Sequence, residues 1–387
     1  MAGFRTRGQP AALAIVARAV ASQRPPSAML IAGPARSGKT TLALDLAAGL
    51  LCLADDPTDR PCRDCAACRK IEHGNHPDVH ALAPTGAGGQ IRIDQARTLI
   101  TDLALLPLEG RVRIAVIASA QRLNPDAQNA LLKTLEEPPA GAVVVLCADD
   151  ETLLLDTVRS RCARIRVGAV AAPTIADLLV ERGAADASAA ATIARLADGR
   201  PGLALAMAAA PEVLVHRAAL ARSLLDLTRA GRRQRLAAGP SLLADAAVLA
   251  ERLVEPSGGA TAMPADLEGV AADSGQGPIG AVAPTGATDV PTRAAPAARR
   301  AAATALIETW RDVARDLVVV LAGGTGLVRD VALLEDYEQA ATGLTLDGVA
   351  AFLARLDGLA AAIEAYANAD LVVDVLLLAW PRARLAA

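Results

Sequence analysis

Short apolar runs alternate with helix-like stretches through the first 168 residues of the chain. Continuous apolar runs bounded by turn residues are typical of strands buried on both faces of a parallel sheet. The stretches between them have helical periodicity. One such stretch ends before Pro138, because proline cannot continue a helix. The pattern therefore predicts an α/β fold with an open parallel sheet covered by helices on both faces. The strands expected are 28–32, 113–118, 142–148 and 163–167, and the main helices are 10–24, 40–53, 95–105 with Asp94 as N-cap, and 126–135.

Beyond residue 168 the pattern becomes almost entirely helical. Residues 174–208 form a small helical block, and long helices are expected later, including 304–322 and 346–367. Residues 255–298 differ, because Gly, Pro, Ala and Thr dominate there with little periodicity, which indicates a flexible insertion. The domains expected are 1–168, 169–210 and 211–387, the last with the insertion at 255–298.

Composition restricts the class of protein. Hydrophobic residues make up 53% of the chain but aromatics only 2%, so the core is expected to be aliphatic and largely helical. A formal charge of −3 argues against a chain that binds nucleic acid through an overall basic surface. No stretch reaches the roughly 18 apolar residues of a membrane span, and the N-terminus does not resemble a secretory leader. We therefore expect a cytoplasmic protein with no membrane contact.

A phosphate-binding loop is predicted between the first strand and the following helix. Gly33 to Thr40 reads G-P-A-R-S-G-K-T, which matches G-x-x-x-x-G-K-[ST] in the context of strand and helix that this motif requires. Backbone N–H groups and the helix N-terminus would surround phosphates, Lys39 would reach the β and γ phosphates, and Thr40 would hold magnesium. The alternative is a relic loop that folds but stays empty. The nucleotide-binding residues predicted are Gly33, Pro34, Ala35, Arg36, Ser37, Gly38, Lys39, Thr40 and Thr41.

Four of the six cysteines are crowded into one short segment. Cys52, Cys62, Cys65 and Cys68 end in a C-x-x-C-x-x-C pattern, and four thiolates suit tetrahedral zinc. In a long chain without a leader this spacing favours metal over disulfides. We predict a structural zinc module at about residues 52–70, against the alternative of four unconnected reduced cysteines. Because four sulfurs complete a site, His73, His76 and His80 are interpreted as surface or packing residues.

Several further motifs resemble one known family. Leu131 to Pro139 reads L-L-K-T-L-E-E-P-P, which resembles the signature of bacterial clamp-loader subunits of DNA polymerase III. Ser160-Arg161-Cys162 resembles another motif of that family, as do Gly8-Gln9 near the start and Asn368-Ala369-Asp370-Leu371 near the end. With the phosphate loop and the cysteines, these motifs resemble the family strongly over residues 4–206 and more weakly afterwards.

The resemblance implies an architecture and a set of partners. Residues 1–168 would be a AAA+ nucleotide-binding domain, 169–210 a helical lid, and 211–387 a helical collar for oligomerisation. The implied partners are gamma/tau motor subunits and a delta subunit in a hetero-oligomeric ring. Through that complex the chain would act on the sliding clamp and primer-template DNA, as part of a DNA polymerase holoenzyme.

The residues that hydrolyse ATP in the motor members of the family are missing here. P-loop motors carry acids after an apolar strand for magnesium and for water, but Ala118 and Ser119 occupy those positions. The sensor region, Cys147 to Asp150, also departs from the family pattern, and the lid arginine falls near Gly202, with Arg200 a doubtful replacement. The departures resemble the delta-prime branch. We therefore expect a chain that can hold ATP and magnesium but hydrolyses ATP poorly or not at all, which leaves open whether it is itself an enzyme.

Arg161 is the predicted catalytic contribution of this chain. By resemblance it would reach the γ-phosphate bound by a neighbouring subunit, where an arginine stabilises the charge that develops in the transition state. The plain alternative is a solvated arginine beside Arg159, Arg164 and Arg166.

Three competing functions remain open from the sequence. An ATP-hydrolysing gamma/tau-like motor would need the acidic pair that Ala118 and Ser119 lack. A small-molecule kinase would not explain the cysteines, the Ser160 motif or the helical C-terminal part. A purely structural protein with a decayed phosphate loop differs from the preferred hypothesis only in nucleotide occupancy.

Overall fold

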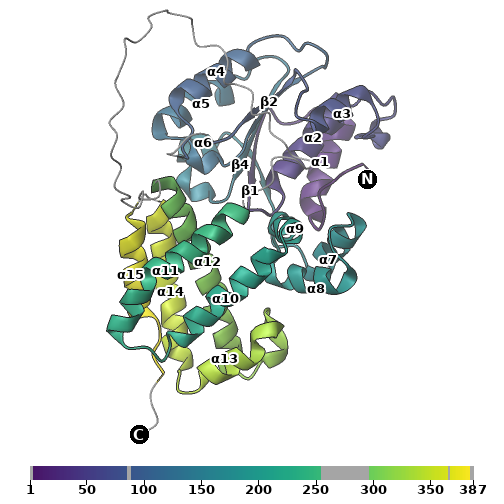
Figure 1. Cartoon of the computed structure of the whole chain (residues 1–387). Coiled ribbons are helices and arrows are strands. Elements are labelled where there is room, and N and C mark those ends of the chain that lie inside the picture. Colours follow the sequence, from purple (N-terminus) through teal and green to yellow (C-terminus); the bar gives the residue numbers. More distant parts are fainter. Residues whose placement is uncertain (1–2, 85–88, 254–295, 365–366, 384–387) are drawn as a thin grey trace, which may run out of the picture.

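A five-stranded parallel sheet organises the N-terminal part of the chain (Figure 1). The computed structural model describes residues 3–84, 89–253, 296–364 and 367–383. The strand order is β2-β3-β4-β1-β5, so β1 lies between β4 and β5 although it comes first in the chain. The strands are β1 (Ala28–Ala32), β2 (Val79–Leu82), β3 (Arg113–Ile117), β4 (Ala142–Ala148) and β5 (Ala163–Arg166).

Helices cover both faces of this sheet, which explains why β1, β3 and β4 are buried at every position (Figure 1). Alternate side chains of β1 point to opposite faces: Met29 and Ile31 join one apolar cluster, whereas Leu30 joins the other. The first cluster includes α1 (Pro10–Ser22), α2 (Lys39–Leu51) and α3 (Ala66–Glu72), and the second includes α4 (Ile93–Leu103), α5 (Pro125–Glu136) and α6 (Asp156–Arg159).

The predicted α/β fold is confirmed, with two local differences. Strand β2 was not predicted: it lies at the edge of the sheet, and all four of its residues are only half-buried, so it lacks a continuous apolar run. The prediction of Asp94 as an N-cap is wrong. Helix α4 begins at Ile93, two residues before the predicted start, and Gln95 Oε1 accepts the backbone N–H of Arg92 at 2.9 Å, so Asp94 lies in the first turn.

The rest of the described chain is helical, and one hydrophobic cluster extends from Val170 to Trp380. Trp310, Phe352 and Trp380 pack on one another at its centre, with ring centroids 4.7 to 5.6 Å apart. The helices are α7 (Ala172–Glu181), α8 (Ala187–Leu196), α9 (Pro201–Ala209), α10 (Glu212–Asp226), α11 (Arg232–Arg252), α12 (Pro296–Leu321), α13 (Leu334–Ala341), α14 (Leu346–Glu364) and α15 (Ala369–Ala379). Single-turn 3-10 helices occur at Pro57–Asp59, Ala120–Arg122, Glu151–Leu153, Thr325–Leu327 and Val331–Leu333.

The hydrophobic cluster from Val170 to Trp380 includes residues of both the expected lid, 169–210, and the expected collar, 211–387. The boundary between these two domains therefore stays a prediction. Residues 296–298 were assigned to the insertion but form the first turn of α12, and the rest of the predicted insertion lies outside the described residues. No single described helix has the length and apolarity to cross a membrane; α9 and α10 satisfy those criteria only together, as a pair bent by 106°.

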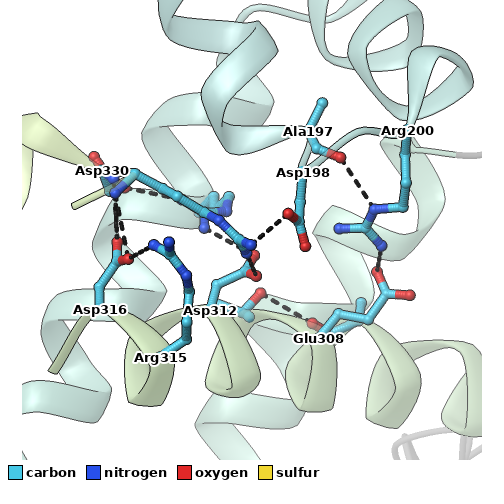
Figure 2. Close-up of polar contacts among 12 residues, drawn as sticks. Ala197, Asp198, Arg200, Glu308, Asp312, Arg315, Asp316 and Asp330 are labelled. Carbon is cyan, nitrogen blue, oxygen red and sulfur yellow. Dashed lines mark hydrogen bonds and ion pairs between the residues drawn. The ribbon is translucent and has the colours of Figure 1, made fainter. Parts of the chain in front are cut away.

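A network of ion pairs connects the α8–α9 region to α12 (Figure 2). Arg329 pairs with Asp198, which follows α8, and its other terminal nitrogen lies 3.5 Å from Asp312 of α12. Arg217 of α10 is buried between Asp312 at 3.0 Å and Asp330 at 2.8 Å. Ion pairs therefore link the end of α8, α10 and α12 to one another.

Candidate nucleotide site and cysteine cluster

The predicted phosphate loop follows the carboxyl end of β1 and leads into α2. Gly38 adopts φ 95° as the residue before α2, a left-handed conformation that favours glycine. A Cβ on Gly33 would lie 2.2 Å from the carbonyl oxygen of Val167, so the loop approaches the end of β5 too closely for a side chain. Both glycines are therefore required by backbone geometry.

An open cavity of about 910 Å³ lies over this loop. The predicted residues from Ala35 to Thr41 all line it, whereas Gly33 and Pro34 do not. Instead, the Nζ of Lys39 donates to the carbonyl oxygens of Gly33 at 2.9 Å and Pro34 at 2.6 Å. The volume lies within the range of small-molecule sites.

Lys39 is also paired with a carboxylate. Its Nζ lies 2.6 Å from Oδ1 of Asp149, which follows β4, and its side chain is only 7% exposed. Gln121 fixes Asp149 from both sides: Gln121 Nε2 donates to Oδ2 at 2.8 Å, and the backbone N–H of Asp149 donates to Gln121 Oε1 at 3.2 Å. In the sequence, Asp149 lies in a stretch that departs from the family pattern, but only the fold shows that it reaches Lys39.

Ala118 and Ser119 line the cavity beside the phosphate loop, where P-loop motors carry their acids. Among the described residues that line the cavity, Asp149 supplies the one carboxylate, and Lys39 neutralises it. The cavity therefore offers cationic and N–H groups for phosphate, without an unpaired acid to activate water.

Helix α9 contacts the phosphate loop directly. The backbone N–H of Gly202 donates to the carbonyl oxygen of Arg36 at 3.0 Å, and a Cβ on Gly202 would lie 3.2 Å from that oxygen. Arg36 in turn donates through Nη2 to the carbonyl oxygen of Leu253 at 2.7 Å. Arg200, considered as a replacement lid arginine, does not line the cavity; it donates to the carbonyl oxygen of Ala197 and pairs with Glu308 (Figure 2).

The Gly8-Gln9 motif ties the N-terminal segment to the sheet domain. Gln9 exchanges two hydrogen bonds with the backbone of Gly168, at 2.6 and 3.1 Å. The buried Asp45 carboxylate accepts the backbone N–H groups of Arg5 and Thr6 at 2.9 to 3.1 Å, and the Thr6 hydroxyl at 2.7 Å. Residues 5–7 are thereby fixed along the cavity as a strap.

Arg161 does not line this cavity. Its Nη2 lies 2.5 Å from Oε1 of Glu136, and its Nη1 donates to the carbonyl oxygen of Thr157 at 2.8 Å. Glu136 belongs to the motif that ends at Pro139, so the structure brings two of the family-like motifs into contact. The side chain of Arg161 remains about one-third exposed.

The four predicted cysteine ligands converge. The sulfur atoms of Cys52, Cys62, Cys65 and Cys68 all lie within 4.8 Å of one another, and those of Cys52 and Cys65 are 4.0 Å apart. Tetrahedral zinc with bonds of about 2.3 Å separates its sulfurs by about 3.8 Å, so the donor set fits. The three histidines considered do not belong to this group; the Nδ1 of His76, for example, accepts the N–H of Asp78.

Within the cluster the environment favours a thiolate at Cys65, whereas burial raises the pKa of Cys52 and of Cys68. Backbone N–H groups point at three of the sulfurs, at 3.4 to 3.5 Å. Burial opposes ionisation of Cys65, but hydrogen bonds from the backbone of Leu53 and Cys68 and from neighbouring thiols lower its pKa to about 7. The other two cysteines, Cys147 and Cys162, are buried and separate, and burial raises their pKa to about 12 and about 11.

The parallel sheet, the phosphate loop after β1 and the helices that follow define a P-loop domain of the AAA+ class. Residues 8–171 match the family model described as DNA polymerase III, delta subunit. The chain is 33% identical over 174 residues to DNA polymerase III subunit delta' of Bacillus subtilis, which covers 45% of this chain and 52% of that protein. It is 38% identical over 137 residues to the delta' subunit of Pseudomonas aeruginosa, covering 35% and 42%. Over this N-terminal part, the chain is therefore similar to the delta-prime subunits of bacterial clamp loaders.

The chain is also similar to gamma and tau subunits. The tau subunit of Escherichia coli is 34% identical over 163 residues, covering 42% of this chain and 25% of that protein. A gamma-subunit-related protein of Thermotoga maritima superposes with a TM-score of 0.37 at 21% identity, covering 62% of this chain and 82% of that chain. The chain spans about half the length of the first curated relatives that it matches.

Proposed function

We propose that this protein is a delta-prime type subunit of the DNA polymerase III clamp loader, working in the cytoplasm in a ring with gamma/tau and delta-type subunits. It would help to load the sliding clamp onto primed DNA through that complex. The match of residues 8–171 supports this proposal, as do the phosphate loop, the cysteine cluster and the Arg161 motif, which occur together in one chain.

Within that complex we infer that the chain binds nucleotide without turning it over. The observation that supports this is the composition of the cavity wall: Lys39 and Arg36 face it, but Ala118 and Ser119 replace the acids. When bound, magnesium would bridge the phosphates, and Thr40 is the residue placed to hold it. The backbone of the phosphate loop and Lys39 would orient the phosphates, as P-loops do generally.

We further propose that Arg161 acts on a nucleotide held by the neighbouring subunit. Arg161 does not line the nucleotide cavity of its own chain. Glu136 and Thr157 bind its guanidinium, and the side chain is still partly exposed. On assembly the guanidinium would leave Glu136 and bind the γ-phosphate, which carries more negative charge. This contact would stabilise the transition state of the reaction in the neighbouring subunit.

The resident metal that we propose is zinc, held by Cys52, Cys62, Cys65 and Cys68 in a structural role. Cys52 follows α2 directly, whereas the other three belong to the loop and to α3. Zinc there would tie that loop to the helix of the phosphate loop, and four protein ligands leave no open position for catalysis.

A second candidate function is an ATP-hydrolysing motor subunit of the gamma/tau type. Two observations favour it: tau proteins match the same part of the chain at 34% identity, and the Asp149 carboxylate does lie in the cavity. The pairing of Asp149 with Lys39 supports the non-hydrolysing subunit instead, because that carboxylate is already neutralised.

The test of Arg161 uses the loader assembled from this chain and the gamma/tau and delta-type subunits of the same organism. Arg161→Ala should lower the DNA-dependent ATPase of the assembly, by up to the 10³–10⁵-fold attributed to such arginines. Arg164→Ala is the matched control, since Arg164 is exposed in β5 three residues away. Unchanged ATPase of a fully assembled Arg161→Ala loader would contradict the proposed role of Arg161.

A further inference from the structure

Besides Arg36 of the phosphate loop itself, three arginines line the same cavity. Arg5 and Arg7 belong to the strap, whereas Arg182 directly follows α7. They come from two parts of the structure, because the strap is pinned to Asp45 of the sheet domain and α7 belongs to the helical region after residue 168. The cavity therefore has cationic side chains both at the phosphate loop and at the strap.

The charge of these arginines is only partly balanced. Arg5 pairs with Glu72, and Arg7 lies 3.9 Å from Glu181, but within the described part of the chain Arg182 has no ion pair. Burial and the nearby charges of Arg5 and Arg7 lower the pKa of the Arg182 guanidinium. Like charges thus face one another across the gap between strap and α7.

At the phosphate loop, by contrast, the charge of Lys39 is balanced by Asp149. Arg36 adds a second cation at the phosphate loop, where a nucleotide's 5′ phosphates would bind, and Arg5, Arg7 and Arg182 place further positive charge beside the strap. A nucleotide with those phosphates at the N-terminus of α2 extends its sugar and base away from that helix. The strap and α7 supply the remaining cationic wall of the cavity.

We propose that this cavity takes a nucleotide that carries phosphate on the 2′ or 3′ position of the ribose as well as at the 5′ position, with Arg5, Arg7 and Arg182 holding the second phosphate group. The proposal rests on nucleotide binding at the phosphate loop, as set out under the proposed function. Guanidinium groups suit it because their planar donors match phosphate oxygens in bidentate contacts.

Such a ligand would also connect two parts of the structure. A phosphate shared by the strap and Arg182 neutralises like charges that otherwise repel α7 from the sheet domain. Binding of the ribose-phosphorylated nucleotide would therefore hold α7 against the strap more firmly than binding of ADP does. ADP has no second phosphate group to bind the three arginines. Through its second phosphate, the nucleotide would connect the strap to Arg182 across the cavity.

The test compares ADP with adenosine 5′-diphosphate 3′-phosphate and its 2′-phosphorylated isomer, by calorimetric titration of the whole chain at low salt. We expect at least one phosphorylated isomer to bind about tenfold more tightly than ADP. Arg182→Gln should bring that ratio close to one, whereas Arg195→Gln should keep it. Arg195 is the matched control, an exposed arginine of α8 that does not line the cavity.

The outcomes distinguish failure of this inference from failure of nucleotide binding itself. Equal affinities for ADP and both phosphorylated isomers overturn this inference and leave nucleotide binding intact. No binding of any nucleotide overturns both. A preference that survives in Arg182→Gln assigns the second phosphate to other residues and also overturns the inference. Hydrogen exchange of α7 gives an independent readout, since the phosphorylated nucleotide should protect α7 more than ADP does.

Discussion

The Nζ of Lys39 lies 2.6 Å from Oδ1 of Asp149, so the lysine that a phosphate loop uses to hold phosphates already has an anionic partner in this chain. Gln121 keeps that partner in place with two hydrogen bonds. A bound nucleotide must displace the carboxylate from Lys39 or accept its negative charge beside the phosphates. We therefore expect Asp149 to weaken nucleotide binding, and its carboxylate is not an unpaired acid for hydrolysis.

Replacing Asp149 by Asn should strengthen nucleotide binding. The amide keeps the size of the side chain but removes the competing charge, so we expect the affinity for ADP to rise about tenfold, or about 1.4 kcal/mol. Asp150→Asn is the control, because Asp150 is exposed and caps the turn at Thr152 rather than contacting Lys39. An unchanged or weaker affinity of Asp149→Asn would show that the ion pair does not compete with phosphate.

The cysteine cluster should contain one zinc ion per chain, and its removal should destabilise the sheet domain. Cys62→Ser is expected to release the metal and lower Tm, because the remaining three sulfurs cannot complete a tetrahedral site. Cys162→Ala should keep the metal, since Cys162 lies outside the cluster. Metal analysis with thermal melts checks both; a Cys62→Ser protein with unchanged zinc content would refute the ligand assignment.

Buried Asp78 should make stability depend on pH. Burial opposes its ionisation, but the N–H groups of Leu108, Glu109 and Gly110 donate to the carboxylate at 2.6 to 2.9 Å and hold its pKa below the ordinary 3.8. A depressed folded-state pKa stabilises the protein at pH above 3.8, and this contribution is lost as the pH falls through the depressed value.

We therefore expect Asp78→Asn to cost about 2–3 kcal/mol at pH 7, since it removes a charge that accepts three hydrogen bonds and faces Arg113. The difference should shrink as the pH falls below 3.8. Asp94→Asn, at an exposed first-turn position of α4, is the control and should change the free energy of unfolding by less than about 1 kcal/mol. Denaturant titrations at several pH values measure both; a cost that does not vary with pH would contradict this role of Asp78.

The buried ion network should be sensitive to loss of its central cation. Arg217→Ala leaves the carboxylates of Asp312 and Asp330 buried without their main partner, which is expected to cost about 3–5 kcal/mol. Arg222 lies on the same helix and pairs with Asp336 at 3.1 Å, but it is exposed, so Arg222→Ala should cost about 1 kcal/mol or less. Similar costs for the two variants would show that burial does not control the network.

Features encoded by neighbouring residues could be predicted from the sequence. Strand β1, the phosphate loop and the cysteine cluster all depend on residues close together in the chain. The pairing of Lys39 with Asp149 could not be predicted in this way, because it depends on β1 and β4 being neighbours in the sheet. Likewise, only the packing of the helices shows that Arg200 turns away from the cavity toward Glu308.

Turnover of ATP by the purified chain is the most direct test of the central claim, that this subunit holds nucleotide without hydrolysing it. The measurement combines titration of ADP and ATP with a steady-state phosphate-release assay on the zinc-loaded chain alone. We predict binding that Lys39→Ala abolishes, with no phosphate release above that of the Lys39→Ala protein. Sustained phosphate release that Lys39→Ala removes would contradict the account and identify the chain as a motor in its own right.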